Sequence, residues 1–189
     1  MKVLGIDPGS LRCGFSVLED LGGRVPRVCE AGVWRLGDGV PLPDRLAKLW
    51  KHLDQILSEH SPSVLSIEES FVHKNVHSAM VLGHARGVIL AACATRGMTV
   101  TEFAPSSIKQ AVAGSGRATK ERVAEMARMQ LGLQELPDSA DATDALAIAL
   151  CWFSSRSPTS GVIAGSKASR STKKQGFDVE AYLKRIGKG

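Results

Sequence analysis

The chain has 189 residues, of which 43% are hydrophobic, and its formal net charge is +5. This amount of apolar material is enough for one sizeable core and favours a single domain over two. The N-terminus, MKVLGIDPGS, lacks the basic and apolar regions of a signal peptide, and we find no apolar stretch near the ~20 residues that a membrane span needs. We therefore expect a cytoplasmic protein without a membrane partner.

The positive charge is concentrated in the C-terminal tail. From Ser154 onward, eight Lys or Arg residues stand against two acids, whereas residues 1 to 153 hold 16 basic and 17 acidic residues. The tail is rich in Ser, Gly and Lys, a composition typical of flexible linkers, although residues 177 to 186 could form a short helix. The sequence therefore predicts a folded domain over 1 to 153 and a basic flexible tail over 154 to 189.

The four cysteines are scattered along the chain and form no CxxC pair: Cys13, Cys29, Cys93 and Cys151. Their spacing matches neither a zinc ligand set nor a disulfide framework. We interpret them as reduced thiols.

The first part of the chain reads as three strands joined by short turns. Residues 2 to 7, 12 to 20 and 27 to 37 are rich in strand-forming residues, and a Pro-Gly turn follows the first run, which predicts an antiparallel meander. Residues 44 to 60 then place apolar side chains three and four positions apart behind an acidic start, a pattern typical of an amphipathic helix.

Strands and helices alternate in the rest of the folded part. We expect strands at 63 to 70 and 98 to 105 and helices at 75 to 96, 105 to 114, 118 to 132 and 138 to 155. A meander followed by alternating strands and helices indicates an α/β domain with a mixed sheet between helix layers.

Four acids stand where packing alone would not require them. Asp7 ends the first strand, Glu68 ends the fourth, and Asp141 and Asp144 lie three residues apart on the last helix. Each could be only a turn former, a strand end or a helix cap. Together they suggest a shared pocket, in which carboxylates repel one another unless a cation joins them. Ligands that are all oxygen suit Mg²⁺ or Mn²⁺ rather than zinc.

Several motifs, in order along the chain, resemble the RuvC family of Holliday-junction resolvases: GIDPGS, IEESF, LGHARGV, IKQAVAGSGRATKERV and DSADATDALAIAL. The resemblance covers residues 1 to about 153. It implies a ribonuclease-H-like fold with a mixed five-stranded sheet flanked by helices. It also implies a homodimeric, Mg²⁺-dependent endodeoxyribonuclease that nicks four-way DNA junctions symmetrically in homologous recombination and DNA repair. By position, the family's four catalytic and metal-binding acids match Asp7, Glu68, Asp141 and Asp144.

The chemistry implied by this resemblance is phosphodiester hydrolysis with two Mg²⁺ ions in each active site, with Mn²⁺ as a substitute. Such ions, about 3.5 to 4 Å apart, activate the attacking water and stabilise the leaving oxygen. We expect Asp7 to bridge the two ions and Glu68 and Asp141 to hold one side each. Asp144 is then either a ligand or the base for the water.

Candidate DNA contacts follow from basic and aromatic residues near these motifs. Arg117 and Lys120 begin a helix behind a glycine-containing loop, which is a plausible phosphate site. The resemblance places Lys109 and Lys120 near the cut phosphate and gives Lys120 a catalytic role; ordinary surface lysines are the alternative. Phe71 could stack on an unpaired base or pack in the core. We also expect the segment after it to contact DNA through three polar or basic residues, His73, Lys74 and Asn75.

Paired cuts require two active sites, so we expect a two-fold dimer. The segment at 75 to 96 has more apolar and small residues than one sheet face can cover, although a helix buried within the monomer would explain them too. A junction branch-migration helicase complex is a further expected partner.

Two other classes of function remain. An ATP-binding domain of the actin and sugar-kinase type also begins with a Gly-Ile-Asp strand, but it needs a second domain for which 189 residues are too few. A catalytically silent DNA-binding relative would lack one of the four acids, and all four are present.

Overall fold

The computed structural model describes residues 1–23, 25–69 and 76–156. The strands in these residues are β1 (Lys2–Asp7), β2 (Arg12–Glu19), β3 (Arg27–Arg35), β4 (Val64–Glu68) and β5 (Thr99–Phe103). The helices are α1 (Leu42–His60), α2 (Val76–Thr95), α3 (Pro105–Ala113), α4 (Lys120–Gln130) and α5 (Ala140–Arg156). Every strand and helix predicted for these residues is present, with ends that differ by only a few residues.

The strands form one mixed five-stranded sheet in the order β3-β2-β1-β4-β5. The first three strands pair antiparallel as the predicted meander, and β4 and β5 continue parallel to β1. The expected mixed sheet is therefore confirmed. Because β1 and β4 are parallel neighbours, their carboxyl ends lie at the same edge of the sheet.

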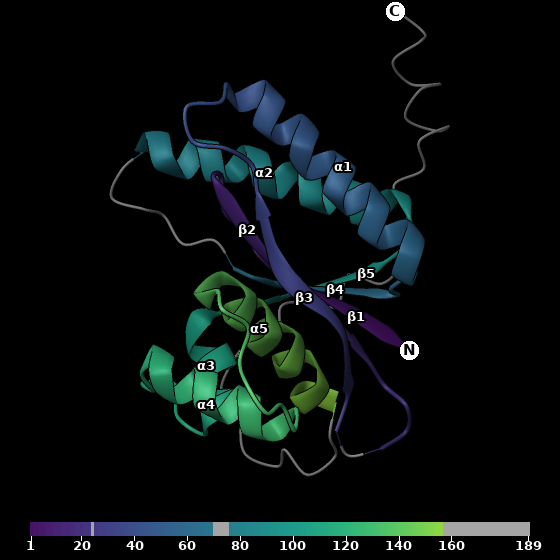
Figure 1. Cartoon of the computed structure of the whole chain (residues 1–189), viewed down its shortest axis with the longest axis vertical. Coiled ribbons are helices and arrows are strands. Elements are labelled where there is room, and N and C mark those ends of the chain that lie inside the picture. Colours follow the sequence, from purple (N-terminus) through teal and green to yellow (C-terminus); the bar gives the residue numbers. More distant parts are fainter. Residues whose placement is uncertain (24, 70–75, 157–189) are drawn as a thin grey trace, which may run out of the picture. The chain divides into compact units, whose positions relative to one another are not determined.

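Helices cover both faces of this sheet (Figure 1). Alternate residues of β1 point to opposite faces, so Leu4 and Ile6 join the core under α1 and α2, whereas Val3 joins the core under α3, α4 and α5. The same alternation in β4 sends Leu65 and Ile67 to the α1 and α2 side. The sheet thus separates two apolar cores.

Helix α5 lies directly against the backbone of the central strands. A Cβ atom at Gly5 would lie 2.4 Å from the carbonyl oxygen of Ala145, and one at Gly14 would lie 2.0 Å from that of Asp141. The buried hydroxyl of Ser16 also donates to the Ala145 carbonyl, at 2.8 Å. Small residues on β1 and β2 therefore let the helix approach closely and fix where its first turns lie.

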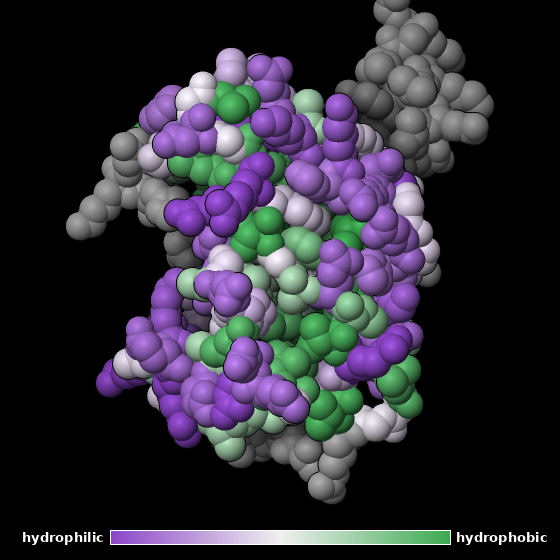
Figure 2. Space-filling model, viewed as in Figure 1, coloured by the Kyte–Doolittle hydropathy of each residue, from purple (hydrophilic) through white to green (hydrophobic). Residues whose placement is uncertain are grey.

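Helix α1 is amphipathic as predicted, with its buried positions at Leu49, Leu53, Ile56 and Leu57. Figure 2 shows mostly polar side chains over the outward side of this helix. The one large apolar exception is Trp50, whose surface is 45% exposed, on the side of α1 that adjoins α2.

Helix α2 corrects one expectation from the sequence. By length and composition, its 20 residues could cross a membrane. An 18-residue stretch of the helix has a mean hydropathy of 1.3, and 22% of that stretch is buried. The expectation that no stretch reaches this length was therefore wrong. Length and composition alone are weak support for a membrane span, because core helices of soluble proteins share them. Part of the exposed surface is apolar, with Val76 70% and Met80 60% exposed.

The described part of the chain ends with α5, in one compact unit over Met1–Ser157. The predicted tail, including the segment 177 to 186, lies outside the described residues from 157 onward. All four cysteines are free thiols, and three of them, Cys13, Cys93 and Cys151, are buried.

Candidate active site

Asp7 and Glu68 are the last residues of β1 and β4 and lie at one edge of the sheet. Side-chain alternation places both on the α5 face, because Gly5 contacts α5 and Ser66 donates to the carbonyl of Ile148 in that helix. Two carboxylates thus leave neighbouring strands toward the same helix.

Asp141 and Asp144 come from the first turns of α5, which face these strand ends. The backbone of Asp141 contacts Gly14, and Gly14 pairs directly with Asp7 in the sheet. The approach of α5 to the sheet therefore brings the helix acids to the strand acids, as their positions in the sequence predicted.

The electrostatics of Asp7 show that the four carboxylates interact. Burial, and after it the negative charges of Asp144, Glu68 and Asp141, raise the pKa of Asp7 to about 7. Burial and the charge of Asp144 also raise the pKa of Glu68. A cluster of this kind stabilises a bound cation, because the cation relieves the repulsion that raises these pKa values.

Lys120 lies beside the acids at the start of α4. Its amine donates to Asp144 Oδ2 at 3.0 Å, although three quarters of the Lys120 side chain is exposed. This hydrogen bond is the main reason why the pKa of Lys120 is raised, so the side chain is held in its charged form. Lys109 of α3 lines the same pocket as Glu68, Lys120 and Asp144.

Two amides of the loop before α4 are already hydrogen-bonded within the protein. The amide of Gly116 donates to Gln110 Oε1 at 3.1 Å, and that of Arg117 donates to Ser115 Oγ at 3.3 Å. Helix α4 is capped by Thr119, whose side chain accepts from the Arg122 amide. The amides of Gly116 and Arg117 are therefore not available to a phosphate in this arrangement, whereas the side chains of Arg117 and Lys120 supply positive charge.

One basic neighbour of the acids was missed from the sequence. Arg12, the first residue of β2, has its Nε 4.0 Å from Asp141 Oδ2, and 69% of its side chain is exposed. The signal was its position directly after the turn that follows Asp7. The other predicted DNA contacts, Phe71, His73, Lys74 and Asn75, lie outside the described residues.

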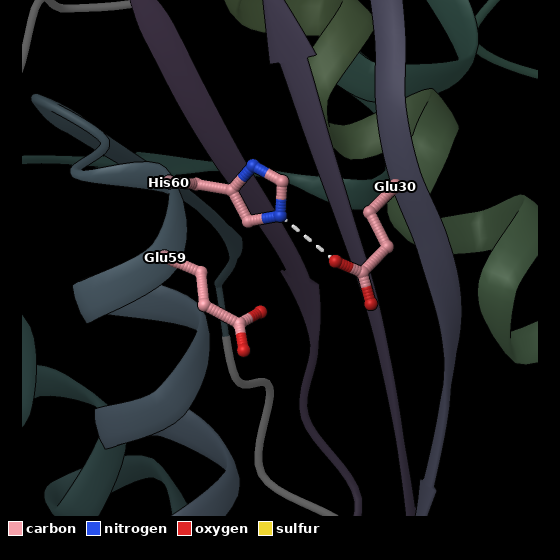
Figure 3. A group of neighbouring side chains, drawn as sticks. All are labelled: Glu30, Glu59 and His60. Atoms are coloured by element: carbon pink, nitrogen blue, oxygen red, sulfur yellow. Dashed lines mark hydrogen bonds and ion pairs between the residues drawn. The ribbon is translucent and has the colours of Figure 1, made fainter.

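The acids supply only oxygen donors, which fits a hard divalent ion such as Mg²⁺ or Mn²⁺. In the described ranges, the one set of three potential ligands with donor atoms within 4.8 Å of one another lies elsewhere: Glu30, Glu59 and His60. Figure 3 shows this set between α1 and β3, with His60 Nε2 hydrogen-bonded to Glu30 at 2.8 Å. We interpret this contact as a link between α1 and the edge strand.

A family model described as crossover junction endodeoxyribonuclease RuvC matches residues 3–152. The chain belongs to the RuvC family. The resemblance seen in the sequence motifs is confirmed, and so is the endonuclease class that it implied.

Individual RuvC proteins are similar over most of the chain. The crossover junction endodeoxyribonuclease RuvC of Halorhodospira halophila is 43% identical over 167 residues, which cover 88% of this chain and 98% of that protein. A Thermus thermophilus RuvC structure has a TM-score of 0.74 and 35% identity, covering 82% of this chain and 94% of that chain. The structure of T. thermophilus RuvC in complex with a Holliday junction substrate has the same TM-score at 32% identity and the same coverage. These similarities confirm the ribonuclease-H-like fold of the RuvC proteins.

Proposed function

We propose that this chain resolves four-way DNA junctions by Mg²⁺-dependent phosphodiester hydrolysis at the acids Asp7, Glu68, Asp141 and Asp144. The observation that carries the proposal is the convergence of the four acids where the first turns of α5 approach the ends of β1 and β4. The raised pKa of Asp7, a half-buried carboxyl near the other three, supports it. The similar T. thermophilus RuvC was solved in complex with a Holliday junction substrate. An all-oxygen site at the end of a rigid sheet supports divalent-ion hydrolysis of that substrate.

The acids divide by the elements that hold them. Asp7 interacts with all three others, so it would be the central ligand shared by the proposed ions, and Glu68 and Asp141 would be further ligands. A divalent ion bound here would activate water and offset charge on the phosphate. Mg²⁺ and a count of two ions are our proposal for this site, with Mn²⁺ as a substitute.

Lys120 and Asp144 supply the proton and charge chemistry beside that site. Asp144 accepts from the Lys120 amine, which orients the carboxylate and leaves the remaining amine protons for a phosphate oxygen. Asp144 would then hold an ion or accept a proton from the attacking water, and Lys120 would offset negative charge in the transition state. Lys109 in the same pocket, and Arg117 before α4, would contact the DNA backbone.

Phe71, His73, Lys74 and Asn75 remain proposed DNA contacts on the basis of the sequence motifs. They follow Glu68 by three to seven residues, so they begin at the strand end that carries the acids. An aromatic side chain in such a segment could stack on a base that is unpaired at the junction.

We also propose that the protein acts as a homodimer through the groove between α1 and α2. Leu46 and Trp50 of α1 line it together with residues of α2: Met80, Gly83, His84, Gly87, Val88 and Ala91. The occupant that we propose is α2 of a second copy. Each chain has one set of four acids, whereas resolving a junction into two duplexes requires two related cuts, and a two-fold dimer supplies both.

The remaining proposals concern regions and partners outside this site. We propose that the basic residues beyond 157 form a tail that adds nonspecific DNA affinity to the domain that precedes it. A branch-migration helicase complex remains a predicted partner, and the cytoplasm remains the predicted location.

The decisive experiment incubates the purified chain with a labelled four-way junction and, separately, with a plain duplex of the same sequence. We expect paired, symmetric nicks in the junction when Mg²⁺ is added, none in EDTA, and little cutting of the duplex. Equal cutting of both substrates would contradict junction selectivity. Cutting that persists in EDTA would contradict the metal mechanism.

A further inference from the structure

Arg86 connects α2 to the strand end that carries Glu68. Its Nη1 donates to the backbone carbonyl of Glu68 at 2.7 Å, and its Nη2 pairs with Glu102 Oε2 of β5 at 2.5 Å. Only 12% of the Arg86 side chain is exposed, although it is charged. A buried guanidinium is held in place where both a carboxylate and a carbonyl accept its protons.

Arg86 reaches Glu68 from the face of the sheet opposite to the acids. Leu65 and Ile67 of β4 pack in the core under α1 and α2, so the side chain of Glu68 points to the α5 face. Arg86 belongs to α2 and therefore contacts the backbone of Glu68 and not its carboxylate. It is not a residue that would touch substrate or ion.

The position of this contact matters because the β1–β4 ladder ends one residue before it. The register between these strands runs to Ile6 and Ile67, and Pro8 after Asp7 has no amide hydrogen. On the other side, the amide of Glu69 donates to the carbonyl of Phe103 at 2.9 Å. The backbone around Glu68 is thus fixed by β5 through Glu69 and by Arg86 through the carbonyl of Glu68.

We propose that Arg86 is a positioning residue that fixes the carboxylate of Glu68 by clamping its backbone from the α2 face, with Glu102 orienting the guanidinium. The inference rests on the proposed role of Glu68 as a ligand. Residues that orient metal ligands change metal affinity by about ten- to hundredfold when they are substituted. Loss of Arg86 should therefore weaken divalent-ion binding while the fold persists.

The test titrates the full-length chain with Mn²⁺ and measures free ion by electron paramagnetic resonance, without DNA. The variants are R86Q, R86K, E102Q and, as the reference for a lost ligand, E68Q. The matched control is R96Q, because Arg96 just after α2 also pairs with an acid at 2.5 Å, Asp54, and its guanidinium bonds to residues of α1. Circular dichroism and light scattering check the fold and the mass of each variant.

We expect R86Q to weaken Mn²⁺ binding about tenfold or more, E102Q to weaken it less, R86K to restore part of it and R96Q to leave it unchanged. Junction cleavage by R86Q should recover at high Mn²⁺ concentration, which a general loss of fold would not allow. If R86Q does not fold, the Mn²⁺ affinities of R86K and E102Q test the role of Arg86 in its place. Wild-type Mn²⁺ affinity in both variants would overturn the inference.

Two outcomes separate this inference from the proposed function. Weakened binding in E68Q beside wild-type binding in R86Q overturns the role of Arg86 alone. Wild-type binding in E68Q overturns the ligand role of Glu68 and, with it, the inference.

Discussion

The amine of Lys120 and the carboxylate of Asp144 form a 3.0 Å hydrogen bond between the starts of α4 and α5. These residues are 24 positions apart in the chain and meet where both helices approach the ends of β1 and β4. A positive charge therefore lies against the acid cluster before any substrate or ion is bound, and its side chain remains mostly exposed to an incoming phosphate.

Lys120→Ala should lower the single-turnover rate of junction cleavage by about a hundredfold, because a charge that stabilises the transition state is removed. Junction affinity should fall much less. Arg122→Gln, on the exposed side of the same helix, is the control and should keep the wild-type rate. Equal losses in the two variants would reduce Lys120 to a general contributor of positive charge.

Asp7→Asn should abolish cleavage and spare junction binding. The substitution removes the central carboxylate of the proposed metal site, but it also lowers the repulsion between the protein and DNA phosphates. Gel-shift affinity in Ca²⁺ or EDTA should therefore equal or exceed that of the wild type. Binding lost in proportion to cleavage would instead make Asp7 a structural residue.

The raised pKa of Asp7 predicts how the stability of the metal-free protein depends on pH. The pKa of Asp7 in the folded state is about 7, above the ordinary aspartate value of 3.8, so the folded protein binds more protons than the unfolded chain between these values. The free energy of unfolding should therefore fall as pH rises from about 4 to 7 and level off above that range.

In EDTA at pH 8, Asp7→Asn should be more stable than the wild type by about 2 to 4 kcal/mol, and this difference should shrink toward pH 4. Thermal melts across the pH range measure it. Saturating Mg²⁺ should stabilise the wild type but not the variant. A difference that does not change with pH would show that the carboxylate of Asp7 is not the titrating group.

Gly83→Arg should give a folded monomer that nicks one strand at a time. A Cβ atom at Gly83 meets nothing within 4 Å, so the monomer accommodates the new side chain, whereas close packing of α2 against a second copy does not. Light scattering beside circular dichroism measures the mass and the fold. Gly23→Arg, also open at its Cβ position, is the control. A dimer of unchanged mass would place the two-fold axis elsewhere.

Removal of residues 158 to 189 should leave the melting temperature of the domain within a few degrees of the wild type, because α5 and the apolar cores are complete before that point. Junction affinity should fall most at low salt, where the positive charges of the tail count most. An insoluble truncated protein would show that the tail contributes to the core.

The order of strands and helices, and the grouping of the four acids, could be predicted because the patterns are local. Asp7 and Glu68 each end a strand, and parallel neighbours carry such residues to one edge. Asp141 and Asp144 lie at the start of a helix whose apolar residues require it to pack on the sheet. Family motifs then supplied the chemistry that spacing alone left open.

Other parts of the site could not be predicted, because they depend on contacts through space. Arg86 precedes Glu102 by 16 residues and reaches the site through the opposite face of the sheet, so no spacing rule links them. The pairing of Lys120 with Asp144 depends on the angle between two helices. The apolar length of α2 was underestimated because its small residues and single charge interrupt the run of large apolar side chains.

The contact of α5 with the sheet has a consequence for how this protein can change in evolution. At Gly5 and Gly14 the helix rests on backbone atoms, so the distance between its acids and the strand acids is set without any side chain in between. Substitutions among the apolar residues on the far side of α5, toward α3 and α4, can alter volume and shape without changing that distance. Sequence drift in that core can thus shift Lys109 and Lys120 on α3 and α4, but the spacing of the four acids is constrained by two residues that have no side chain to vary.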